Sequence, residues 1–151
     1  MTLPHLFGWT AVEINYAHPQ WDRVRDCAAP AVGGITSPHQ VDAWVNEFVT
    51  YAPDAADHWQ TPAETLERGR GDCEDFAILK RAMLLAAGYR GGVLFVIVHD
   101  LISRRDHAIL VADGLVLDSF NSLSLPVERV RDYNPVMAMA GNRCWTFGRA
   151  I

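Results

Sequence analysis

Residues 70–87 read Arg-Gly-Asp-Cys-Glu-Asp-Phe-Ala-Ile-Leu-Lys-Arg-Ala-Met-Leu-Leu-Ala-Ala, and the predicted fold is organised around them. Asp72 occupies the position of a helix N-cap, and Gly88 ends the helix predicted over about 73–87. From Phe76 to Leu85 the apolar side chains point in nearly all directions around this helix. Because a helix that is apolar all round is normally buried, we expect it to be the central helix of the fold.

Cys73 is the first candidate for a chemical role, because it lies at the start of this helix. The unpaired backbone N–H groups and the positive dipole end of a helix start favour a thiolate over a thiol. The thiolate is the nucleophilic form of cysteine. The alternative is that Cys73 is simply a small core residue, as most cysteines are. A histidine and an aspartate farther along the chain favour the chemical role.

Capping residues predict two further helices upstream. Ser37-Pro38-His39-Gln40 combines an N-cap serine, a proline in the first turn and a glutamine at the third helical position. Apolar residues follow it at helical spacing as far as residue 49. Thr61-Pro62-Ala63-Glu64 is a second capping box, and Gly69 suits the end of its helix. Residues 1–36 show little periodicity, and we expect them to wrap over the surface with a short helix near residues 12–16.

The second half of the chain predicts strands. Residues 93–98 form a continuous apolar run typical of a central strand. Residues 107–112 and 115–120 flank Asp113-Gly114, a strong signal for a two-residue hairpin turn. Residues 143–147 are a candidate last strand.

Helices followed by antiparallel strands indicate the α+β class. We expect N-terminal helices and a central buried helix packed on an antiparallel sheet. The 151 residues fit one domain, with an N-terminal wrapping segment at residues 1–36 and the main body at residues 37–151.

The hairpin predicts a contact between a histidine and a carboxylate. If Asp113-Gly114 is a two-residue turn, Ile109 lies opposite Asp118, and His107 shares a face with Ile109. Asp118 then lies diagonally next to His107. A carboxylate there can hold the imidazole in one tautomer, and the central helix could bring Cys73 to the other ring nitrogen. His99, beside Asp100, is a rival base, but it has no predicted cross-strand carboxylate.

Composition excludes several classes of protein. Half of the residues are hydrophobic (50%), which is typical of a globular protein. The net charge is −5 without a basic cluster, so nucleic-acid binding is disfavoured. Three cysteines without a close pair indicate neither a zinc ribbon nor a redox dithiol. No window is long and apolar enough for a membrane span.

Four short segments occur in order along the chain. They are Trp-Gln-Thr-Pro-Ala-Glu at 59–64, Gly-Asp-Cys-Glu-Asp at 71–75, His-Ala at 107–108 and Leu-Asp-Ser at 117–119. Over roughly residues 37–147 the sequence resembles the bacterial transglutaminase-like cysteine proteinases.

This resemblance implies a papain/transglutaminase-like fold and a cysteine peptidase domain at residues 37–151. It implies catalytic roles for Cys73, His107 and Asp118. It also implies an oxyanion hole built partly from the Cys73 backbone N–H, with Trp59 or Gln60 as a further donor.

The resemblance further implies a calcium ion held by Asp72, Glu74 and Asp75. Clustered carboxylates suit a hard cation with oxygen ligands. Acids in the first turn of a helix are also expected without a metal, because they cap the helix and complement its dipole. The sequence contains no EF-hand loop.

Three functions remain open at this point. The chain could be a cysteine peptidase or amidase that works through a thioester on a protein or peptide substrate. It could be a transglutaminase-type acyl transferase, in which an amine replaces water as the acceptor. It could also be a non-enzymatic peptide-binding module.

The sequence does not indicate an oligomeric state. The N-terminus carries no signal peptide, which predicts a cytoplasmic or a virion- or prophage-associated protein, or a periplasmic one if an export segment is missing.

Overall fold

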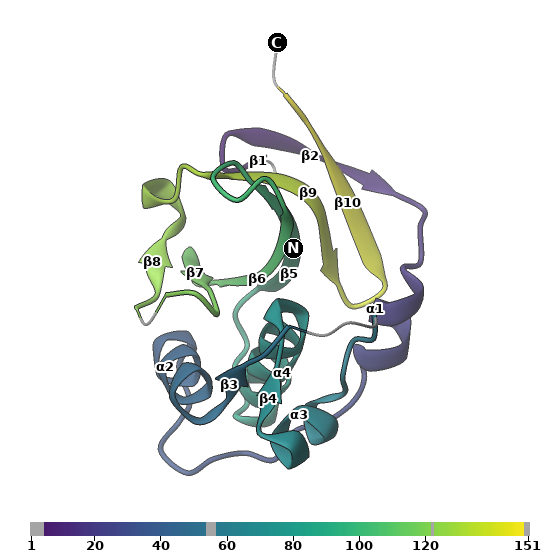
Figure 1. Cartoon of the computed structure of the whole chain (residues 1–151). Helices are drawn as coiled ribbons and strands as arrows, with labels where there is room; N and C mark the ends of the chain where they lie inside the picture. Colours follow the sequence, from purple (N-terminus) through teal and green to yellow (C-terminus); the bar gives the residue numbers. More distant parts are fainter. Residues whose placement is uncertain (1–4, 54–56, 122, 150–151) are drawn as a thin grey trace.

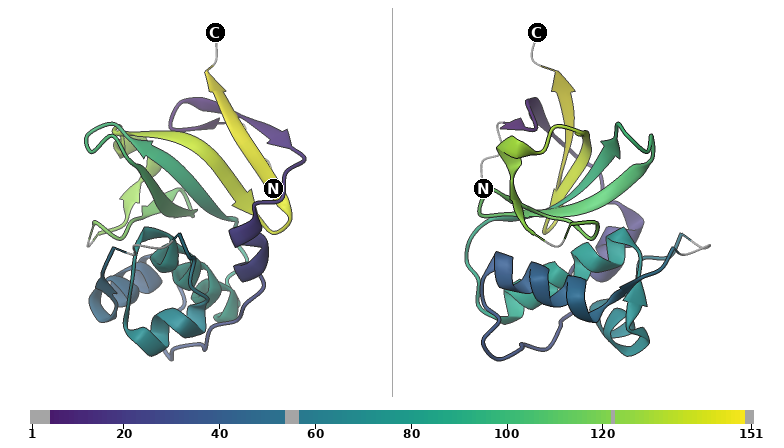
Figure 2. Two further views of the ribbon diagram at one scale, coloured as in Figure 1. Left: turned by 45° about the vertical axis from the view of Figure 1, so that its right-hand side comes forward. Right: turned by 60° about the vertical axis from the view of Figure 1, so that its left-hand side comes forward.

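The computed structural model describes residues 5–53, 57–121 and 123–149. A strongly curled antiparallel sheet lies over a group of helices, and α1 lies beside the end of the sheet (Figures 1 and 2). The helices are α1 (Pro19–Val24), α2 (Pro38–Phe48), α3 (Pro62–Arg68) and α4 (Cys73–Ala86), with one 3-10 turn, η1 (Val127–Arg129).

The main sheet has the strand order β1-β2-β10-β9-β5-β6-β7-β8, and β3 and β4 form a separate parallel pair. The strands are β1 (His5–Leu6), β2 (Trp9–Ile14), β3 (Thr50–Tyr51), β4 (Arg70–Gly71), β5 (Val93–Asp100), β6 (Asp106–Ala112), β7 (Leu115–Leu117), β8 (Leu125–Pro126), β9 (Tyr133–Ala140) and β10 (Arg143–Arg149).

The predicted helix caps are confirmed. Ser37, Thr61 and Asp72 each accept a hydrogen bond from the backbone N–H of the third helical residue, and each forms a reciprocal capping box. Gly69 ends α3 in the left-handed conformation, with φ 67°. α4 is buried on nearly all sides, as its sequence predicts, although Leu85 near its end is exposed.

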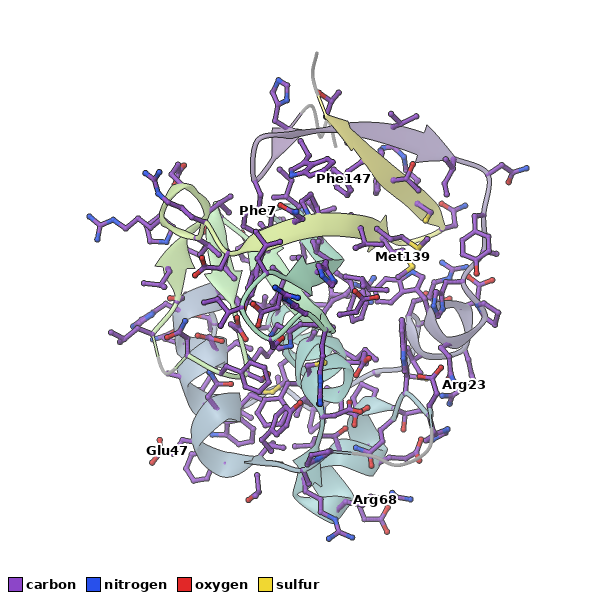
Figure 3. The ribbon with its side chains drawn as sticks, turned by 45° about the horizontal axis from the view of Figure 1, so that its top comes forward. Phe7, Arg23, Glu47, Arg68, Met139 and Phe147 are labelled. Atoms are coloured by element: carbon purple, nitrogen blue, oxygen red, sulfur yellow. The ribbon has the colours of Figure 1, made fainter. Side chains whose placement is uncertain are left out.

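The continuous apolar run of β5 is explained by burial of both sheet faces. Alternate residues contact the helices on one face, and the intervening residues pack inside the curl of the sheet on the other. Phe7 and Phe147 belong to the cluster inside the curl, and Met139 belongs to the cluster on the helix side (Figure 3). Glu47 and Arg68 point away from both clusters into solvent.

The N-terminal segment differs from the prediction. Residues 12–16 are not helical: β2 pairs with β10, and the first helix begins at Pro19. Trp21 and Val24 of α1 lie in the core. Two strands within residues 5–14, β1 and β2, are therefore part of the sheet. Within the described ranges, no helix has the length and hydrophobicity needed to cross a bilayer.

Candidate active site

Cys73 is the first residue of α4, and it is held there by the Asp72 cap. The helix lies under the sheet, where it packs closely against β6 (Figure 1). The Cys73 side chain is buried, and the backbone N–H of Ala108 in β6 lies beside its sulfur. Because Ala108 directly follows His107, this contact brings the thiol next to the strand that holds the imidazole.

His107 and Asp118 form a buried pair. The predicted hairpin is present, with Ala112 opposite Leu115, and Asp118 follows directly after β7. The distance from His107 Nε2 to Asp118 Oδ1 is 2.7 Å. Since Nε2 is occupied by the carboxylate, Nδ1 is the ring nitrogen left for another partner. The contact expected from the hairpin register is therefore present.

Cys73 and His107 line the same cavity of about 380 Å³, together with residues of the β5–β6 hairpin tip. The ring of Phe120 lies flat on the His107 imidazole, with the centroids 4.4 Å apart and an interplanar angle of 8°. Phe120 also lines a neighbouring cavity of about 290 Å³. The thiol of Cys73 and the imidazole of His107 therefore line one cavity, and the carboxylate of Asp118 lines the neighbouring one.

The electrostatics of Asp118 favour its ionised form. Burial alone would raise its pKa, but the hydrogen bond and charge of His107 hold the pKa of Asp118 below its ordinary value. The hydroxyl of Tyr133 and the backbone N–H of Phe120 add two further hydrogen bonds to the carboxylate. An ionised Asp118 is a suitable acceptor for a proton on His107 Nε2.

The expectation that the helix start lowers the pKa of Cys73 is wrong. Burial raises the pKa of the thiol, and the charge of Glu74 raises it further. Glu74 Oε2 lies 3.3 Å from the sulfur. The hydrogen bond from the Ala108 backbone N–H lowers the pKa of the thiol, but desolvation and the nearby negative charge outweigh it.

The three acids proposed for calcium occupy different environments. Asp75 is buried, and its two oxygens accept hydrogen bonds from the backbone and side chain of Gln60 and from the Asp72 backbone. Burial raises the pKa of Asp75 to about 7. Asp72 and Glu74 lie side by side, and burial together with the Glu74 carboxylate raises the pKa of Asp72 to about 6. Among the described residues, no group of three His, Cys, Asp or Glu side chains has the arrangement of a metal site.

The two expected oxyanion donors lie away from the cavity lining. Gln60 donates to Asp75, Thr65 Oγ1 and the Arg70 carbonyl, so its N–H groups support the α4 cap. Trp59 stacks on His18 with the centroids 4.5 Å apart. The oxyanion role of either residue stays a prediction. The Cys73 backbone N–H has no hydrogen-bond partner in the described part of the chain and remains free for an oxyanion.

Sequence reasoning missed three residues that surround Asp118. Tyr133 donates to its carboxylate, Phe120 covers the His107 ring, and Asn46 of α2 donates to the Asp118 carbonyl at 3.0 Å. For Asn46, the sequence offered one signal: a polar residue among the apolar positions of the helix that follows Ser37. No local pattern pointed to Tyr133, because its partner lies 15 residues earlier.

Comparisons with known proteins identify the family and the fold of this chain. The sequence model of the bacterial transglutaminase-like cysteine proteinases (BTLCP) matches residues 31–134. Calcium-bound Legionella pneumophila LapG matches with a TM-score of 0.66 and 29% sequence identity, over 72% of this chain and 66% of the LapG chain. EGTA-treated LapG from the same organism matches with a TM-score of 0.66 and 27% identity, over 75% of this chain and 70% of LapG. The search of curated proteins gives no match.

The matches cover only part of each chain. The chain spans just under two thirds of calcium-bound LapG, and β1, β2 and β10 lie outside the residues matched by the family model. The matched region nevertheless contains α2, α3, α4, β5, β6 and β7, together with Cys73, His107 and Asp118. The helix-on-curled-sheet arrangement is the papain/transglutaminase-like fold, and the chain belongs to the family of bacterial transglutaminase-like cysteine proteinases.

Proposed function

We propose that this chain hydrolyses peptide bonds with Cys73 as nucleophile, His107 as general base and acid, and Asp118 as the residue that orients His107. The main support is the buried 2.7 Å contact between His107 and Asp118, together with the cavity that His107 and Cys73 both line. The family match and the likeness to LapG support the same reaction class.

The proposed reaction begins with proton transfer from the thiol to His107 Nδ1, the ring nitrogen that Asp118 leaves free. Because the pKa of Cys73 is raised, the thiolate forms together with the imidazolium rather than as a free anion. The sulfur attacks the carbonyl carbon, and the Cys73 backbone N–H stabilises the oxyanion. His107 then protonates the leaving amine, and water activated by the same imidazole hydrolyses the thioester.

We further propose that Asp72 and Glu74 hold a calcium ion. These neighbouring carboxylates lie within hydrogen-bond reach of each other, and such oxygen donors suit a hard divalent cation. Asp75 fits less well as a direct ligand, since three N–H donors already occupy its oxygens. A bound calcium ion would supply positive charge beside the thiol. The calcium-bound form of LapG supports this proposal.

The test uses a library of internally quenched fluorescent peptides with purified wild-type protein and the Cys73→Ala variant. We expect hydrolysis by the wild type and none by Cys73→Ala. Cys27→Ala and Cys144→Ala are matched controls, because both are free thiols outside the cavity lining, and they should retain activity. Hydrolysis by Cys73→Ala would refute the proposal. Incorporation of a fluorescent amine in place of peptide hydrolysis would indicate an acyl transferase instead.

A further inference from the structure

The carboxylate of Asp118 has more partners than orientation of an imidazole requires. Oδ1 accepts from His107 Nε2 at 2.7 Å and from the Phe120 backbone N–H at 3.0 Å. Oδ2 accepts from the Tyr133 hydroxyl at 2.5 Å. His107 and Tyr133 therefore hold opposite oxygens of one buried carboxylate. Such an arrangement fixes the rotation of the carboxylate about its Cβ–Cγ bond.

The position of Tyr133 is itself well fixed. It is the first residue of β9 and pairs with Asp100 of β5. The preceding carbonyl of Asp132 accepts a hydrogen bond from the Leu101 backbone N–H at 2.8 Å. The Tyr133 ring packs edge-on against Phe7, at a centroid distance of 6.3 Å. Backbone pairing and ring packing therefore both fix the position from which its hydroxyl reaches Asp118.

The chemistry of the phenol suits a permanent hydrogen-bond donor. Burial and the Asp118 carboxylate both raise the pKa of Tyr133 above its ordinary value. The hydroxyl therefore keeps its proton over the whole range in which a thiol hydrolase works. Without it, Oδ2 would be a buried carboxylate oxygen that lacks a partner, which is a costly state that favours rotation of the side chain.

We infer that Tyr133 is a positioning residue, whose hydroxyl fixes Asp118 and through it the tautomer and the orientation of the His107 ring. This inference rests on the proposed function. In this role Tyr133 acts on the reaction only through the carboxylate. Its ring lies 5.7 Å from the His107 ring, so loss of the hydroxyl alone would leave the ring packing in place.

The first experiment compares Tyr133→Phe with wild type on the peptide found in the library assay. The substitution keeps the ring contacts and removes only the hydroxyl. We expect kcat to fall roughly 10- to 100-fold, the range for loss of a hydrogen bond to a charged group, with little change in KM. In a protein that already carries Asp118→Asn, adding Tyr133→Phe should change kcat by less than about twofold. The two residues act on the imidazole as a unit, so the effects of losing each on kcat do not add. Additive losses would overturn the inference.

Tyr89→Phe is the matched control. Tyr89 lies beyond the last residue of α4, whereas Cys73 is the first, so roughly 20 Å of helix separates it from the thiol. Tyr89→Phe also removes one tyrosine hydroxyl, and this variant should keep the wild-type kcat. A wild-type kcat in Tyr133→Phe would refute the positioning role while leaving the proposed function intact. Activity that survives in Cys73→Ala would instead refute the proposed function.

A second readout does not require turnover. The proton on His107 Nε2 points at Asp118, so its NMR resonance reports directly on this hydrogen bond. In Tyr133→Phe we expect the resonance to move and to broaden through faster exchange with water. Incorporation of 3-fluorotyrosine at position 133 keeps the fold and makes the phenol a stronger donor, and it should also shift the resonance. An unchanged resonance in both proteins would overturn the inference.

Discussion

The ring of Phe120 lies parallel to the imidazole of His107 at 4.4 Å, and the two differ sharply in exposure. His107 is 4% exposed, whereas Phe120 is 59% exposed. The phenyl ring therefore covers one face of the imidazole and excludes water from it. Because the backbone N–H of Phe120, rather than its side chain, donates to Asp118, the cover can be removed without breaking that hydrogen bond.

Phe120→Ala should uncover His107. We expect faster carbethoxylation of His107 by diethyl pyrocarbonate, measured by mass spectrometry of the peptide that contains it. Phe120→Leu, which keeps an apolar cover, should react at nearly the wild-type rate. Phe48→Ala is a matched control, because Phe48 is also 59% exposed but packs on Trp44. Equal rates in Phe120→Ala and wild type would show that the ring does not shield the imidazole.

Lys80 and Asp42 form an ion pair inside the core, and this pair supports the loop that follows β7. Lys80 Nζ lies 2.8 Å from Asp42 Oδ1, and both side chains are excluded from solvent. Asn46 contacts Asp42 at 3.4 Å and donates to the carbonyls of Asp118 and Asn121. Burial lowers the pKa of Lys80 and raises that of Asp42, so each charge depends on the other.

Lys80→Met should therefore lower the free energy of unfolding by about 3–5 kcal/mol, because it leaves a buried carboxylate without its cation. The double variant Lys80→Met/Asp42→Leu should recover most of this loss, since no unpaired charge remains. Urea unfolding of the wild type, the single variant and the double variant measures both values. If the double variant were as unstable as the single one, the loss would come from packing rather than from the orphaned charge.

Asp118 predicts a dependence of stability on acidic pH. The pKa of its carboxyl is lowered on folding, through His107 and its other donors against the opposing effect of burial. A group of this kind stabilises the fold above its unfolded pKa of about 3.9, and this stabilisation is lost as pH falls through the folded value.

The unfolding free energy of wild type should thus exceed that of Asp118→Asn most clearly above about pH 5, and the difference should shrink as the pH falls toward about 2. Urea unfolding at a series of pH values gives the comparison. A difference that stayed constant down to the lowest pH would contradict the lowered pKa.

Calcium binding can be tested without activity. Isothermal titration of calcium into the protein should show binding that is lost in Asp72→Asn/Glu74→Gln, because these are the two neighbouring carboxylates. Glu67→Gln is a matched control on an exposed acid of α3. Binding that survives in the double variant would place the ion elsewhere, and the absence of binding to wild type would refute the calcium proposal.

Local chemistry made much of the site predictable. The three helix caps and the Asp113-Gly114 turn each depend on a few adjacent residues. Asp113 and Gly114 adopt φ values of 55° and 68°, which the turn requires, and the register of the hairpin then brings Asp118 to His107.

Long-range pairing was not predictable in this way. β9 contains Pro135, which argues against a central strand, yet β9 lies between β5 and β10. The structure accommodates it with a bulge: Ile97 pairs with Met137 and Val98 with Pro135, so Val136 has no partner opposite it. Tyr133 begins this strand, and its role at Asp118 could not be predicted because the strand itself was not.

Gly71 gives the last prediction, since it lies where the α4 cap and the Gln60 network meet. A Cβ added there would lie 2.6 Å from Asp75 Cβ, 2.8 Å from Asp75 Oδ2 and 3.0 Å from Gln60 Nε2. All three atoms belong to buried side chains that hydrogen-bond to each other. Gly71→Ala should therefore displace Asp75 and lower the free energy of unfolding by roughly 1–3 kcal/mol, as overpacking does.

Gly33→Ala is the matched control, because no atom lies within 4 Å of its added Cβ. Since Asp75 caps the helix that presents Cys73, Gly71→Ala should also reduce the rate of peptide hydrolysis, whereas Gly33→Ala should not. Wild-type stability and activity in Gly71→Ala would show that the cap tolerates a shift of Asp75.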